Sequence, residues 1–168
     1  FKDDNLDEET YIKLIDYHLK NGTNGIVPGG TTGESPTLSH NEHKKIIEIA
    51  VKECRGKIPI VAGTGSNSTE EAVELSKYAE KVGSNGLLVV TPYYNKPTQE
   101  GLYQHYKKIN DNVGIPIIIY NIPSRSVIDM NVETMKRLYE FKNIVGVKDA
   151  TGDLDRVDQQ LKAMGKNF

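Results

Sequence analysis

The chain has 168 residues, enough to bury one hydrophobic core, so we expect one domain. Its formal net charge is −2 and its charged side chains are scattered, which argues against a nucleic-acid-binding or membrane-surface protein. No apolar stretch approaches the ~20 residues that cross a bilayer, and the single cysteine, Cys54, has no partner for an internal disulfide. A cytoplasmic globular protein is expected. The start at Phe1, without an initiator Met or a signal peptide, indicates a cut edge.

Segments with helical spacing recur along the chain and begin with recognisable signals. The spacing of apolar residues predicts helices at 7–21, 39–54, 69–83, 98–112, 131–141 and 153–164. Ser39 with Glu42 is a candidate capping box at the start of the second helix. Ser68 with Glu71 is a second candidate, and Thr98 is a candidate N-cap.

Short apolar runs lie between the predicted helices, at 25–30, 58–65, 86–94, 115–123 and 143–152. They start about thirty residues apart, the size of one βα unit, and are continuously apolar, as in a parallel sheet covered by helices. Both a doubly wound sheet and a (β/α)8 barrel fit this pattern. Polar or glycine-rich turns follow nearly every run, which favours a barrel, because a barrel draws its site from many strand ends.

Five strands cannot close a (β/α)8 barrel, whose usual length is ~250 residues. We therefore expect 1–168 to be an incomplete catalytic barrel that covers about strands 2 to 6 and helices 1 to 6, without strand 1 and strands 7 and 8. A complete five-stranded α/β domain is the alternative.

Most single motifs in the chain carry little chemical information on their own. The glycine-rich segment 29–35 lacks the lysine of a phosphate-binding loop and fits no dinucleotide fingerprint. His40 and His43 lie at i and i+3, but no further ligand stands at metal-binding spacing, so we expect surface histidines rather than a metal site.

Lys148 is the most informative single residue, because it ends the apolar run "IVGVKDATGD" at 144–153. A lysine there usually reaches solvent. At the mouth of a barrel, partial burial could instead lower its pKa from about 10.4 to about 7.5, which requires roughly 4 kcal/mol. The neutral amine could then attack a carbonyl, with a phenol such as Tyr120 moving protons. The residues alone suggest a Schiff-base enzyme for a small keto acid.

Four ordered motifs make the chain recognisable: "GGTTGES", "TPYYNKP", "YNIPSR" and "GVKDATGD". In this order and spacing they closely resemble the dihydrodipicolinate synthase family of pyruvate-dependent class I aldolases, which is related to N-acetylneuraminate lyase. The resemblance covers the whole chain. It implies a (β/α)8 barrel and a lyase without metal or organic cofactor. The implied reaction condenses pyruvate with L-aspartate 4-semialdehyde to 4-hydroxy-tetrahydrodipicolinate, in lysine and diaminopimelate biosynthesis.

The same resemblance implies roles for individual residues. Lys148 would form the Schiff base, and Tyr120 would be the proton carrier, hydrogen-bonded to Thr31 and to Tyr94. In the family, the tyrosine that matches Tyr94 reaches into the neighbouring subunit of a homo-oligomer, a dimer of dimers.

Two further residues are expected to hold substrate. By the resemblance, Thr32 would bind the pyruvate carboxylate and Arg125 the carboxylate of aspartate semialdehyde. N-acetylneuraminate lyases and 2-keto-3-deoxy sugar acid aldolases generally lack this arginine, so its presence favours the synthase.

Feedback inhibition by L-lysine is expected as well. In lysine-inhibited members the effector binds at the tight-dimer interface, and the matching positions here are Ser35, Pro36, His40, His43, Gly65, Asn67, Glu71 and Tyr93. Two alternatives stay open: another pyruvate-dependent aldolase, and a non-catalytic truncated α/β binding protein.

Overall fold

A parallel sheet of four strands forms the centre of the chain, seen here in a computed structural model that describes residues 1–168. The strands are β1 (Val61–Gly63), β2 (Gly86–Val90), β3 (Ile117–Asn121) and β4 (Ile144–Asp149). The helices are α1 (Glu8–Lys20), η1 (Ser35–Thr37), α2 (His40–Cys54), α3 (Thr69–Val82), α4 (Gln99–Asn110), α5 (Pro123–Ser126), α6 (Val132–Tyr139) and α7 (Asp155–Met164). No helix combines the length and the apolar character that crossing a membrane requires.

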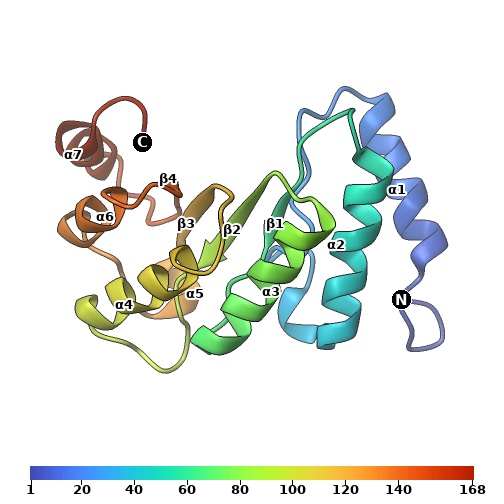
Figure 1. Ribbon diagram of the computed structural model, residues 1–168, viewed down its shortest axis with the longest axis horizontal. Helices are drawn as coiled ribbons and strands as arrows, with labels where there is room; N and C mark the ends of the chain where they lie inside the picture. The colour runs from blue at the N-terminus through green and yellow to red at the C-terminus, as the bar shows by residue number, and fades with distance from the viewer.

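Strand order in the sheet follows chain order, β1-β2-β3-β4, and every neighbouring pair is parallel. Consecutive major helices also pack against one another, α1 on α2, α2 on α3, α3 on α4, α4 on α6 and α6 on α7. Figure 1 shows α1, α2 and α3 towards one end of the molecule and α4, α6 and α7 towards the other. A doubly wound sheet reverses its strand order at a switch point, and this sheet does not. The helices therefore cover one face in a single layer, as in part of a (β/α)8 barrel.

Side-chain caps fix where most of the predicted helices begin. The capping box at α2 is confirmed, because the Ser39 hydroxyl accepts from the Glu42 N–H while the Glu42 carboxylate accepts from the Ser39 N–H. Thr98 caps α4 through the Gly101 N–H, as predicted. The second predicted box is wrong: Ser68 accepts from the Glu71 N–H, but the Glu71 carboxylate accepts from the Ser66 hydroxyl instead.

The apolar run at 25–30 was predicted as a strand and contributes only an isolated bridge between Ile26 and Ile60. The Ile26 N–H donates to Pro59 O at 3.1 Å, and the Gly63 N–H donates to Pro28 O at 2.8 Å. Pro28 has no N–H to give in return, and Gly29 turns the chain away at φ +68°. The segment therefore lies beside β1 as a neighbouring strand would, with a ladder cut short by proline.

The two faces of the sheet are covered very unequally. On the outer face, which the helices cover, Leu87, Val89, Ile117 and Ile119 join a core of 23 buried residues. On the inner face, a cluster of three buried residues contains Leu88, Tyr120 and Ile122. The inner face near the ends of β2, β3 and β4 is thus the open side of the sheet, where side chains can meet a ligand.

Candidate functional site

Tyr120 and Lys148 stand opposite each other at the carboxyl edge of the sheet, where the strands end. They are register partners in the ladder between β3 and β4, and the Lys148 Nζ lies 4.2 Å from the centroid of the Tyr120 ring. Because side chains alternate along a strand, Asp149 lies on the outer face, where its carboxylate meets Gln160 of α7. Lys148 then belongs to the inner face, beside Tyr120. The structure therefore places an amine next to a phenol.

Burial of the pair is uneven. Tyr120 is 7% exposed, whereas Lys148 is exposed. Lys148 therefore reaches solvent, as a lysine at a strand end usually does, and the partial burial considered for a barrel mouth is not seen in residues 1–168. The exposure of Lys148 has a physical reason: β4 is the last strand of the sheet, so the inner face beside Lys148 has no cover on that side.

A cavity of about 200 Å³ lies at the same edge of the sheet; Val90, the register partner of Tyr120, lines it, whereas Tyr120 and Lys148 do not. It brings Thr31 and Arg125 together with residues expected to bind an inhibitor, and its lining is Thr31, Ser35, Pro36, Gly65, Val90, Tyr93, Ile122, Arg125 and Ser126. A side chain at Gly65 would collide with the backbone of Val90, so the cavity wall requires glycine there. The cavity is small, partly apolar and flanked by a cation, which suits a small carboxylate.

The two adjacent threonines have different surroundings. Thr31 lines the cavity beside Arg125, whereas Thr32 lines a separate, largely apolar hollow between the segment 26–34 and helices α1 and α2. The Tyr120 backbone carbonyl accepts from the Thr91 N–H, but its hydroxyl forms no hydrogen bond with Thr31 or Tyr94 within this chain. The predicted relay of hydroxyl groups is therefore not assembled in this structure.

Arg125 is presented by a short, strained turn of helix. The Arg125 N–H donates to Ile122 O at 3.0 Å, and the Ser126 hydroxyl lies 2.9 Å from both Ile122 O and Ile128 O. Val127 ends α5 at φ +66°, a left-handed conformation that is rare for a β-branched residue. The Arg125 guanidinium is exposed and pairs with no carboxylate of this chain, so its charge is free for an anionic ligand.

Tyr94 lies in solvent and does not line the cavity. It is 87% exposed, and its backbone has φ +73° in the turn that follows β2. The turn is tied down by the Asn95 side-chain amide, which donates to Asn67 O at 3.1 Å. The structure thus holds a phenol out into solvent on a fixed, strained turn.

Several residues expected to bind an inhibitor lie together beyond the cavity. The His40 Nε2 is 3.7 Å from the Glu71 Oε1, and the Ser66 hydroxyl donates to the Glu71 Oε2 at 2.7 Å. Asn67 follows Ser66 directly in the chain, so its position adjoins this imidazole and carboxylate. This set of groups suits the ammonium and carboxylate of an amino acid.

His43 was predicted at the surface and is instead buried, so that prediction is wrong. Its Nε2 lies 2.7 Å from Gly63 O, and burial lowers the pKa of the imidazole below its usual range. A side chain at Gly29 would run into the His43 ring, so histidine and glycine fix each other's place behind the segment 29–35. His43 supports this loop from inside, through contacts with Gly29 and Gly63 that no local sequence pattern indicates.

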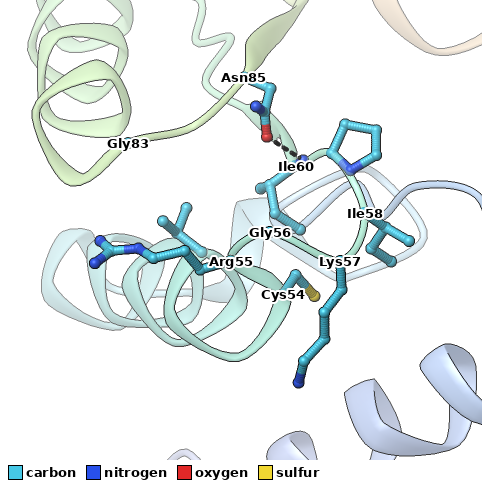
Figure 2. A pocket seen from close by; sticks show the side chains of 10 residues that line it. Cys54, Arg55, Gly56, Lys57, Ile58, Ile60, Gly83 and Asn85 are labelled. Atoms are coloured by element: carbon cyan, nitrogen blue, oxygen red, sulfur yellow. Dashed lines mark hydrogen bonds between the residues drawn. The ribbon is translucent and has the colours of Figure 1, made fainter.

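A second hollow, of about 340 Å³, lies at the amino edge of the sheet, where the strands begin. Figure 2 shows Arg55 and Lys57 pointing in different directions around it, while the Asn85 side-chain oxygen accepts from the Ile60 N–H at 2.8 Å. Its polar groups do not converge on one point. This hollow therefore lacks the arrangement of a catalytic site.

One group of polar residues behind the site was missed by the sequence analysis. Arg156 of α7 binds Asp129, and the Asn121 side-chain amide donates to the same carboxylate at 2.8 Å. Arg156 and Asp129 are separated by 27 positions in the sequence, so no local pattern connects them.

Comparison with known proteins identifies the chain's family. The sequence profile of the Dihydrodipicolinate synthetase family matches residues 1–168. The chain belongs to this family. It is 70% identical over 168 residues to a 4-hydroxy-tetrahydrodipicolinate synthase of Pelagibacter ubique (strain HTCC1062), covering 100% of this chain and 57% of that protein. The crystal structure of dihydrodipicolinate synthase from Aquifex aeolicus superposes with a TM-score of 0.98 at 51% identity, over 100% of this chain and 58% of that one.

Two other similar structures contain ligands of interest. A chloride-inhibited dihydrodipicolinate synthase of Acinetobacter baumannii, complexed with pyruvate, matches with a TM-score of 0.94 at 51% identity over 98% of this chain and 57% of that one. The enzyme of Cyanidioschyzon merolae with lysine bound matches with a TM-score of 0.93 at 39% identity over 97% and 56%. The chain thus spans somewhat more than half the length of the relatives that it matches.

Proposed function

We propose that the full-length protein condenses pyruvate with L-aspartate 4-semialdehyde to 4-hydroxy-tetrahydrodipicolinate, a cytoplasmic step of lysine and diaminopimelate biosynthesis. The observation that carries this proposal is the register pairing of Lys148 with Tyr120, with Nζ 4.2 Å from the ring. Family membership and the Acinetobacter baumannii complex with pyruvate support it.

In the proposed reaction Lys148 is the nucleophile. Its neutral amine attacks the keto carbon of pyruvate, and the resulting carbinolamine loses water to give a Schiff base. A proton then leaves the methyl carbon, and the enamine attacks the aldehyde carbon of the second substrate. The amino nitrogen of that substrate next attacks the imine carbon, which closes the ring and releases Lys148.

Tyr120 lies where a proton carrier for these steps is needed, beside the amine and in a partly apolar cluster. Thr31, which lines the cavity, would hydrogen-bond to Tyr120, and Thr32 would hold the pyruvate carboxylate. Tyr94, exposed on its strained turn, would complete the relay in a second copy of the chain, which makes a homo-oligomer, a dimer of dimers, part of the proposal.

The amine also requires a drier setting than residues 1–168 provide. In the proposed full-length barrel the remaining strands cover the inner face beside β4, and this burial favours the neutral amine.

Borohydride trapping tests the proposal directly. Full-length protein is incubated with pyruvate and borohydride, and we expect intact mass to rise by one reduced pyruvate, located on Lys148 by peptide mapping. Lys148→Ala should abolish this gain, whereas Lys142→Ala, a lysine near the opposite end of β4, should leave it intact. No adduct, or an adduct that survives Lys148→Ala, would favour a non-catalytic binding protein.

Arg125 distinguishes the synthase from related aldolases. Arg125→Ala should raise the KM for aspartate semialdehyde and leave pyruvate trapping unchanged, because the free guanidinium is proposed to bind only the second substrate. Turnover of N-acetylneuraminate or a 2-keto-3-deoxy sugar acid by the unmodified protein, without turnover of aspartate semialdehyde, would contradict the assignment.

We further propose inhibition by L-lysine at the residues around Glu71, supported by the lysine-bound relative of Cyanidioschyzon merolae. The proposed site comprises Ser35, Pro36, His40, His43, Gly65, Asn67, Glu71 and Tyr93. Glu71→Gln should raise the lysine concentration needed for half-inhibition, whereas Glu70→Gln, on an exposed position next to it, should not. Equal shifts in both variants would argue against this site.

A further inference from the structure

The outer face of the sheet, directly behind the Schiff-base site, carries a network of polar side chains. Asn121 and Asp149 follow Tyr120 and Lys148 in their strands and are register partners themselves. The Ala150 N–H extends the ladder to Asn121 O at 2.8 Å. Because side chains alternate, each strand end presents one residue to the site and the next to this network.

Asn121 is fully buried and uses both ends of its amide. Its Nδ2 donates to the Asp129 Oδ1 at 2.8 Å, and its Oδ1 accepts from the Met130 N–H at 3.1 Å. A buried amide with both ends bonded has one allowed orientation. The end of β3 is therefore fixed to the segment 129–130 that precedes α6.

Arg156 connects this segment to α7. Its guanidinium donates to both oxygens of Asp129, at 2.6 and 2.7 Å, and to Met130 O at 3.1 Å. The Arg156 side chain is only 14% exposed, and its Nη1 is 3.9 Å from the Asp149 Oδ2. This two-pronged geometry suits arginine and cannot be reproduced by the single ammonium of lysine.

Asp149 fixes the end of β4 in the same way. Its Oδ2 accepts from Gln160 of α7 at 2.7 Å, and its Oδ1 accepts from the N–H and the hydroxyl of Thr151. The residues after Tyr120 and after Lys148 are therefore both tied to one network that contains Asp129 and Arg156.

We propose that Arg156 and Asp129 are positioning residues, which set the orientation of Lys148 relative to Tyr120 from the far side of the sheet. This inference rests on the proposed function for its catalytic consequence. Arg156 lies on the outer face, so it cannot touch a ligand at the site. It acts by preventing the ends of β3 and β4 from turning, which would move both side chains off their common face.

The test compares Arg156→Met with Arg156→Lys and with a control, Arg137→Met, in the full-length protein. Arg137 pairs with Glu100 at 2.9 Å and joins α6 to α4, so its removal also breaks an inter-helix ion pair. Asp129→Asn is a second variant, which keeps the shape of the network and removes its charge. The rate of borohydride-trapped pyruvate adduct at Lys148 is measured for each, with the melting temperature.

The expected trapping rate falls about ten- to a hundredfold in Arg156→Met, because small misplacements of reacting groups carry penalties of this size. Asp129→Asn and Arg156→Lys should lie between Arg156→Met and the unmodified protein, and Arg137→Met should trap at the normal rate despite a lower melting temperature. Equal rates in Arg156→Met and Arg137→Met would overturn the inference.

A second readout is independent of the reaction. The readout is the NMR signal of Lys148 after ¹³C-methylation, recorded in protein without pyruvate. The signal is assigned by its loss in Lys148→Arg, and its chemical shift reports the ring-current field of Tyr120. It should move in Arg156→Met and stay in place in Arg137→Met. If the unmodified protein traps no pyruvate but this signal moves, the proposed function fails and the positioning role stands. An unmoved signal rejects the positioning role.

Discussion

The two edges of the sheet differ in which residues take left-handed backbone conformations in their turns. At the amino edge, the turns that follow helices α1, α2 and α3 take their positive φ angles at glycines, Gly22, Gly56 and Gly83. At the carboxyl edge, positive φ angles also fall on residues with side chains, namely Glu34, Tyr94, Lys96 and Val127. Each such residue costs about 1–2 kcal/mol relative to a relaxed backbone.

The difference shows which edge is built for stability and which for presenting side chains. At the amino edge the turns carry no strained side chains, and Arg55 and Lys57 diverge around the hollow there. At the carboxyl edge, the strained positions place Tyr94 in solvent and end the helical turn that carries Arg125. The strained turns at the carboxyl edge therefore lower the stability of the fold and fix the directions of the side chains that they carry.

The largest contrast between the edges should be in turnover. Lys148→Met in the full-length protein should lower the rate of the proposed condensation by roughly 10⁴-fold or more, because the proposed nucleophile is lost. The double variant Arg55→Met with Lys57→Met, at the amino edge, should keep normal kcat and KM. A steady-state assay with pyruvate and aspartate semialdehyde measures both, and comparable losses would remove the distinction between the edges.

Stability should depend on glycine for different reasons at two positions. In Gly63→Ala the new Cβ would collide with the backbone of Gly29, so we expect a loss of about 3 kcal/mol in the free energy of unfolding. Gly56→Ala meets open space and bears only the left-handed backbone, at about 1 kcal/mol. Urea unfolding of both variants measures the difference, and similar midpoints would contradict it.

Acid should destabilise the protein through buried histidine. Burial lowers the pKa of His105 to about 4, while its Nδ1 bonds Thr69 in the first turn of α3. The unfolded chain binds a proton near pH 6.5, so the stability due to the neutral ring is complete above that pH. It is lost as pH falls towards 4, by at most about 3 kcal/mol.

Melting temperatures recorded between pH 7.5 and 4.5 measure this effect; the chosen range is ~3 pH units wide and spans the ordinary histidine pKa. His105→Gln, which can still bond Thr69, should flatten the profile, whereas replacing the exposed His40 by Gln should not. A profile that keeps its slope in His105→Gln would show that another group is responsible.

The smallest effects should have opposite signs at the two edges. Val127→Gly removes a left-handed β-branched residue and should stabilise the protein by about 1 kcal/mol, while loosening Arg125 and raising the KM for aspartate semialdehyde several-fold. Gly83→Ala at the amino edge should destabilise by about 1 kcal/mol without a kinetic effect. Thermal unfolding and steady-state kinetics of the two variants test the contrast.

Local sequence patterns were sufficient for most of the fold. The periodicity of α2 and α3, the Ser39 capping box and the apolar runs of β2 and β3 each depend on residues close in the chain. The strand predicted at 25–30 was wrong because Pro28 interrupts the ladder, although the apolar composition of the segment is that of a strand. The capping box predicted at Glu71 was wrong because Ser66 competes for the Glu71 carboxylate. The motif alone does not show this contact.

The site was predictable from the sequence only for residues that lie at the ends of the predicted strands. Lys148 and Tyr120 each end an apolar run, so their meeting follows from parallel pairing. The burial of His43 and the bond between Arg156 and Asp129 depend on contacts between distant segments. The exposure of Lys148 depends on what covers β4, which no local pattern specifies.

The sequential order of the strands has a kinetic consequence. Register partners in neighbouring strands lie 25 to 30 positions apart, from Val61 with Gly86 to Leu87 with Ile117. Each ladder can therefore form after closure of a short loop, without waiting for the ends of the chain to meet. Folding can therefore begin at any one βα unit and extend to the neighbouring units.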